Sequence, residues 1–118
     1  MRTKSPDIES LTKEALRLRR RFRAAAHRQG RRAWTREHVM QGFVVDVGDL
    51  MRLVMARSGS RDAADVDARL AHELADCLWS VLVLAKLYRV DLEREFRRMV
   101  DTVARDLARG PARRTARR

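Results

Sequence analysis

Apolar residues recur at helical spacing along four stretches of the chain, and the first of these runs to about Arg28. Ser5 followed by Pro6 is typical of an N-cap with proline in the first turn. Gly30 is suited to the left-handed conformation that ends many helices. The i, i+3, i+4 pattern that predicts this helix consists of Ile8, Leu11, Ala15, Leu18 and Phe22.

A second helix is predicted to begin after Thr35, which can cap it, with Glu37 in its first turn. The segment 57–61, Arg-Ser-Gly-Ser-Arg, is the clearest loop in the chain. The apolar stripe expected to face the core comprises Val39, Phe43, Val47, Leu50 and Val54, extended by Met40, Met51 and Met55.

The third and fourth helices follow. The third is expected to start between Asp62 and Asp65 and to end near Tyr88, and its segment 74–87 is apolar almost all round, as in a buried central helix. Asp91 is the expected N-cap of a helix from Leu92 to about Leu107, which Gly110-Pro111 would end. The side chains expected to point inward on this last helix are Leu92, Phe96, Met99, Val100 and Val103.

Four helices with short connections and no strand pattern predict an all-α protein, a four-helix bundle. The helical domain is expected over residues 1–108, with a basic, disordered tail over 109–118. The third helix is more apolar than one four-helix protomer of this size requires. We therefore expect a homodimer or a higher oligomer such as a homotetramer.

Composition agrees with this fold and bounds the cellular setting. The 118 residues contain 5 Gly and 2 Pro, fewer turn-forming residues than hairpin-rich β proteins use. Cys77 is the single cysteine, which excludes an internal disulfide framework and a cysteine-based zinc cluster. The N-terminus lacks the apolar segment of a signal peptide, and the longest apolar run, Val81 to Ala85, is too short to span a bilayer. A cytoplasmic location with no membrane association is expected.

The net charge of +11 is concentrated at two places. Residues 16–32 hold eight Arg and no acid, and residues 109–118 hold five more Arg. Such clusters favour polyanions, so nucleic-acid binding is an alternative function. The chain lacks a motif that reads bases or an aromatic platform, however, and a solvated arginine-rich face is the favoured explanation of the clusters.

Four acids interrupt the apolar segments of the second and third helices. Asp46 and Asp49 are three residues apart, and Glu73 and Asp76 repeat this spacing, so each pair shares a helix face. Buried carboxylates are usually paired or bound to metal, and Mg²⁺ prefers oxygen ligands. A single pair of this spacing is more often a solvated face, and the spacing alone leaves both interpretations open.

The residues around these acids resemble the MazG-like, all-α nucleoside triphosphate pyrophosphatase family. The family's motif has E-x-x-E on one helix and E-x-x-D on the next. The similar segments here are 42–50 (GFVVDVGDL), 72–79 (HELADCLW) and 84–93 (LAKLYRVDLE), together with Trp34-Thr35. The resemblance covers about residues 34–107, and its most specific part is ELADCLW with VDLE.

The resemblance implies a MazG-like bundle and a Mg²⁺ site, with Mn²⁺ as a possible substitute. Its four ligands would be Asp46, Asp49, Glu73 and Asp76. The implied reaction is attack by a metal-activated water on a nucleoside triphosphate, which releases pyrophosphate and the monophosphate. One of the four carboxylates would serve as general base, and the sequence does not identify which.

Several positions depart from the family pattern. Asp46 and Asp49 stand where the family prefers Glu, and Val45 stands where a further Glu is frequent. Met99 and Val103 occupy positions where many relatives carry Lys and Asn. These departures favour a second alternative, a catalytically weakened binding or regulatory module. The residues predicted to contact substrate are Trp34, as a base-stacking ring, with Arg97 and Arg98 as replacement cations.

Overall fold

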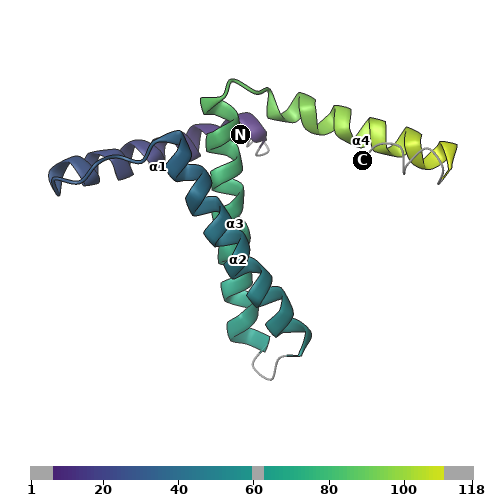
Figure 1. Cartoon of the computed structure of the whole chain (residues 1–118), viewed down its shortest axis with the longest axis horizontal. Helices are drawn as coiled ribbons and strands as arrows, with labels where there is room; N and C mark the ends of the chain where they lie inside the picture. Colours follow the sequence, from purple (N-terminus) through teal and green to yellow (C-terminus); the bar gives the residue numbers. More distant parts are fainter. Residues whose placement is uncertain (1–6, 60–62, 111–118) are drawn as a thin grey trace, which may run out of the picture.

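The computed structural model describes residues 7–59 and 63–110 of the chain. They form the helices α1 (Ile8–Arg28), α2 (Arg36–Ser58), α3 (Ala63–Leu87) and α4 (Leu92–Arg109), and the described residues contain no strand (Figure 1). The prediction of an all-α protein with four helices is confirmed. Ser5, Pro6 and the tail segment 111–118 lie outside the described residues.

Local capping chemistry determines where three of the helices begin. Thr35 caps α2 and Asp91 caps α4, as predicted, because each side chain accepts a hydrogen bond from a backbone N–H of the first turn. The predicted end of α1 near Arg28 is confirmed, but the predicted cap, Ser5, was wrong: the N-cap is Asp7, whose carboxylate accepts from the backbone N–H of Ser10 at 2.8 Å. Gly30 has the expected left-handed backbone, with φ +68°.

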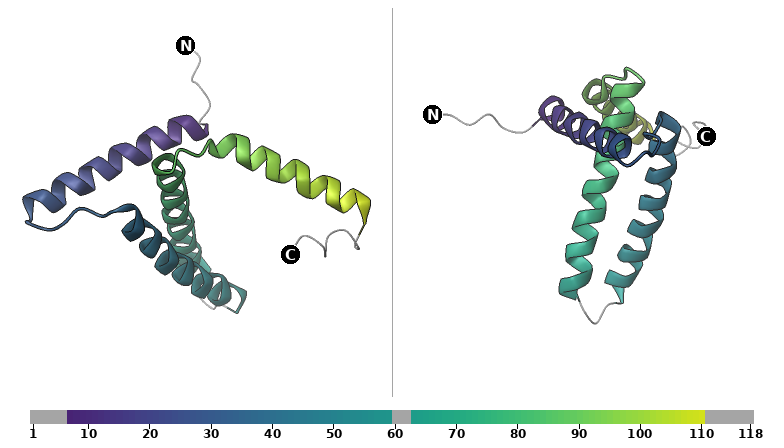
Figure 2. Two further views of the ribbon diagram at one scale, coloured as in Figure 1. Left: turned by 45° about the horizontal axis from the view of Figure 1, so that its top comes forward. Right: turned by 90° about the vertical axis from the view of Figure 1, so that its left-hand side faces the viewer.

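α2 and α3 lie side by side as an antiparallel hairpin, and α1 crosses the end of α3 where that helix terminates (Figure 2). The core lies at this crossing and contains Ala15 of α1, Val39 of α2 and Leu82 and Val83 of α3. The Trp79 indole Nε1 donates to the Ala15 carbonyl at 3.1 Å, which fixes α1 on α3. At the opposite end of the hairpin, Arg57 Nε donates to Asp67 Oδ1 at 2.7 Å.

α4 leaves this core and extends away from the other helices (Figure 1). Its apolar residues were predicted to point inward, but Phe96 is 60% exposed, and Met99 and Val100 are also largely exposed. The Cα radius of gyration is 18.2 Å, against roughly 13.5 Å for a compact chain of this length. One chain therefore forms an open arrangement in which α4 has its apolar stripe uncovered.

The inward face of α2 also differs from the predicted stripe. Val39 is buried as expected, but Leu53, absent from the prediction, is buried as well, whereas Val47 and Val54 are exposed. The exposed residues follow one flank of α2 at spacings of three and four. This flank comprises Met40, Val44, Val47, Met51, Val54 and Met55, and we call it the apolar flank.

None of the helices in the described part of the chain combines the length and apolar character that crossing a membrane requires.

Candidate metal centre

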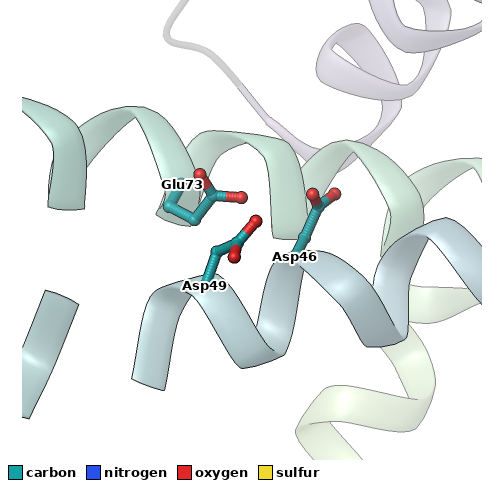
Figure 3. Close-up of side chains that lie close together, drawn as sticks. All are labelled: Asp46, Asp49 and Glu73. Carbon is teal, nitrogen blue, oxygen red and sulfur yellow. The ribbon is translucent and has the colours of Figure 1, made fainter. Parts of the chain in front are cut away.

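Three of the four predicted acids meet between α2 and α3. Asp46 and Asp49 project from α2, and Glu73 projects toward them from α3 (Figure 3). One carboxylate oxygen from each residue lies within 4.8 Å of the other two, and all three residues are half-buried. We call these three residues the acid cluster.

Helix geometry explains why the acids converge. Residues three apart on a helix are displaced by about 4.5 Å and lie near one face, so Asp46 and Asp49 flank the position that Glu73 reaches from the neighbouring helix. Leu53, one turn beyond Asp49, is buried and anchors this face of α2 against α3. The cluster is thus positioned by packed helices rather than by loops.

The electrostatics of the cluster indicate uncompensated negative charge. The pKa of Glu73 is raised above its ordinary value of 4.5, first by partial burial and next by a hydrogen bond with Asp46 and that residue's negative charge. Asp76 and Asp49 raise it further through their charges. Arg52 compensates part of the charge, because its Nη2 donates to Asp49 Oδ1.

These residues fit a hard divalent cation. Carboxylate oxygens are the ligands that Mg²⁺ and Mn²⁺ favour, and Mg²⁺ commonly takes only one or two protein carboxylates with water and phosphate oxygens besides. A cation among Asp46, Asp49 and Glu73 would also relieve the repulsion that raises the pKa of Glu73.

Asp76, the fourth predicted ligand, lies outside the acid cluster. Its Oδ2 is 3.3 Å from His72 Nε2, one turn back on α3. It remains close enough for its charge to raise the pKa of Glu73.

A groove of about 750 Å³ opens beside the acids. Asp46 and Asp76 line one side of it, and its other walls are largely aromatic or apolar. Trp34, predicted to contact substrate, borders this groove together with Trp79 and Phe22. We call this feature the aromatic groove.

Gly42 lets the Trp34 ring lie directly against α2. A Cβ atom at position 42 would stand 2.7 Å from Trp34 Cζ3, closer than a side chain allows. Sequence reasoning did not assign Gly42 a role, although a glycine inside a helical pattern signals a close approach. His38 and Phe22, also unassigned to this site from the sequence, complete the groove near Trp34.

Arg97 and Arg98, the other predicted substrate contacts, lie on α4 away from the acids. Arg97 pairs with Glu93 at 3.1 Å and Arg98 with Glu95 at 3.3 Å, and neither is among the described residues that line the aromatic groove. Within one chain the structure does not bring these cations to the acid cluster.

Cys77 lies next to the acids but is not arranged as a nucleophile. Partial burial, followed by the charges of Asp46, Glu73 and Asp76, raises the pKa of its thiol. A raised pKa keeps the thiol protonated, whereas a reactive cysteine requires the thiolate.

Comparison of the sequence with models of known protein families and with curated proteins, and of the structure with solved structures, gives no match.

Proposed function

We propose that the protein is a Mg²⁺-dependent nucleoside triphosphate pyrophosphohydrolase, which converts an NTP or dNTP to the monophosphate and pyrophosphate in the upkeep of nucleotide pools. The observation that carries this proposal is the acid cluster of Asp46, Asp49 and Glu73, of which Asp46 also lines the aromatic groove. The resemblance of segments 42–50, 72–79 and 84–93 to the MazG-like family supports the same activity.

Each part of the site has a task in this proposal. Asp46, Asp49 and Glu73 hold the cation, with Asp76 as the fourth acid beside them. The bound cation supplies charge neutralisation for the phosphates and a lowered pKa for its water. The Trp34 ring, which lies against α2 at Gly42, provides an apolar surface for the base, and the other aromatic residues of the groove lie beside it.

We also propose that the working form is a homodimer or a higher oligomer. The chain exposes 9915 Å² of surface, roughly 3,300 Å² more than a compact monomer of this mass exposes. A standard interface requires only about 800 Å² from each partner. The apolar flank of α2 is exposed in one chain, as are Leu74 and Leu78 of α3, and a second copy would cover the apolar flank.

The test is pyrophosphate release from a panel of NTPs and dNTPs with Mg²⁺ or Mn²⁺. We expect turnover with at least one nucleotide and a loss of at least a hundredfold in Glu73→Gln. Glu14→Gln, which removes the same charge from the exposed face of α1, is the matched control and should retain full activity. Turnover that is absent for every nucleotide, or equal in Glu73→Gln and Glu14→Gln, would refute the proposal.

A second candidate function is metal-dependent nucleotide binding without efficient hydrolysis. It is favoured by the short side chains of Asp46 and Asp49 and by the ion pair that holds Asp49 to Arg52. Calorimetry that detects Mg²⁺-dependent nucleotide binding by a chain without turnover would select this candidate.

The nucleic-acid alternative predicts instead tight, salt-sensitive binding of DNA or RNA that is lost when the arginine clusters are neutralised.

A further inference from the structure

A second cavity, of about 350 Å³, shares aromatic residues with the aromatic groove but has none of the acids among its described lining residues. Its lining comes from the second half of α1, the segment between α1 and α2, the start of α2 and one residue of α3. Phe22, Trp34 and Trp79 border both this cavity and the aromatic groove. Three arginines also line it, Arg19, Arg23 and Arg31. We call it the arginine pocket.

Arg19 has an unsatisfied donor in this pocket. Its Nη2 donates to the Trp34 carbonyl at 3.2 Å, which orients the side chain. Its Nε is buried and has no hydrogen-bond partner in the described structure. Buried polar groups nearly always find partners, so this unpaired N–H leaves the Arg19 guanidinium with hydrogen-bonding capacity that the described residues do not use.

The charge of the pocket is also unbalanced. Burial, followed by the positive charge of Arg23, lowers the pKa of Arg19. Arg31 Nε donates to the neutral amide of Gln29 at 2.8 Å, so this contact does not neutralise it. No Asp or Glu is among the described residues that line the pocket. An anion would therefore gain attraction from three cations without displacing an acid.

The shape and chemistry of the pocket select among anions. Guanidinium groups bind phosphate through paired N–H donors, and they are well matched to its oxygens. The indole of Trp34 provides a flat apolar surface for a planar ring next to those donors. A volume of 350 Å³ is within the range of pockets that enclose small molecules, and exceeds what inorganic phosphate alone requires.

We infer that the arginine pocket is a metal-independent binding site for a nucleoside monophosphate, with the phosphate on Arg19, Arg23 and Arg31 and the base against Trp34. This site is distinct from the acid cluster and does not depend on the proposed hydrolysis. If hydrolysis occurs, its monophosphate product is a ligand of this class, and the pocket would then retain or sense product.

The experiment is calorimetric titration of the full chain with AMP in EDTA, so that no divalent cation can hold phosphate at the acid cluster. Saturable binding at one site per chain is expected, weakened at least tenfold in Arg19→Gln and in Arg23→Gln. Arg17→Gln removes the same charge from an exposed position of α1 outside the pocket, and is expected to change the affinity less than twofold. Because Arg23 is exposed, Arg23→Gln keeps the test valid if Arg19→Gln does not fold.

Three results would overturn the inference. No saturable binding in EDTA would exclude the site, and equal losses in Arg17→Gln and Arg23→Gln would reduce it to general attraction by a basic helix. Inorganic phosphate binding as tightly as AMP would remove the role of the planar ring. Glu73→Gln is expected to bind AMP normally in EDTA, so a failure of this site and a failure of the proposed hydrolase remain distinguishable.

Discussion

Replacing Met51 with glutamate tests whether a second copy covers the apolar flank of α2. Met51 lies at the centre of that flank and is 62% exposed in one chain. Full burial of a methionine side chain contributes about 2.5 kcal/mol, so covering its exposed part contributes about 1.5 kcal/mol. A symmetric dimer contains the residue twice, and the loss of about 3 kcal/mol corresponds to a roughly hundredfold weaker association.

The assay is sedimentation equilibrium over a range of concentrations. Wild type is expected to be dimeric or larger. Met51→Glu is expected to raise the protein concentration at which half of the dimer dissociates by about a hundredfold or more, because a carboxylate also resists burial. Val45→Glu is the matched control, because Val45 is similarly exposed, at 63%, but lies on the side of α2 that borders the aromatic groove. A monomeric wild type, or equal effects of the two variants, would refute the assignment of this face to an interface.

Two further predictions concern the metal-free protein and the core. The folded-state pKa of Glu73 is raised, so the folded chain binds more protons than the unfolded chain at pH values just above 4.5; metal-free stability therefore falls as the pH rises through that window. In thermal melts in EDTA, the melting temperature of Glu73→Gln should fall less with rising pH than that of wild type, and it should be higher than that of wild type at pH 7. A pH profile equal to that of wild type would contradict the charge repulsion described for the cluster. Val83 is 0% exposed at the helix crossing, and Val83→Ala should lower the protein's free energy of unfolding by about 2–3 kcal/mol. Urea unfolding measures this loss. The control is Val45→Ala at an exposed position, which should change the free energy of unfolding by less than about 0.5 kcal/mol.

The parts of the fold that depend on local chemistry could be predicted from the sequence. Thr35 and Asp91 are caps because a short polar side chain can reach the free N–H groups of the next turn. The pairing of Asp46 and Asp49 with Glu73 follows from helical spacing and from the placement of acids among apolar residues. These inferences require only neighbours on one helix or on the next.

The predictions that failed depend on partners that lie outside the local sequence. Val47 and Leu53 are equally apolar, and no local rule states which of them faces α3. Phe96 was assigned to the core of a bundle, yet α4 contacts little of its own chain. The arginine pocket was also missed, because residues 17–32 look like a solvated face until the chain turns back and brings Trp34 against Arg19.

The acid cluster draws all its members from two helices that are consecutive in the chain and packed as one hairpin. Contacts between segments that are close in sequence require little loop closure and tend to form early in folding. The carboxylates of Asp46, Asp49 and Glu73 therefore come together as soon as α2 and α3 close on each other, before α4 or another chain finds its place. The repulsion among these carboxylates then opposes the first tertiary step of folding. A divalent cation present during refolding should therefore increase the refolding rate as well as the stability of the folded protein.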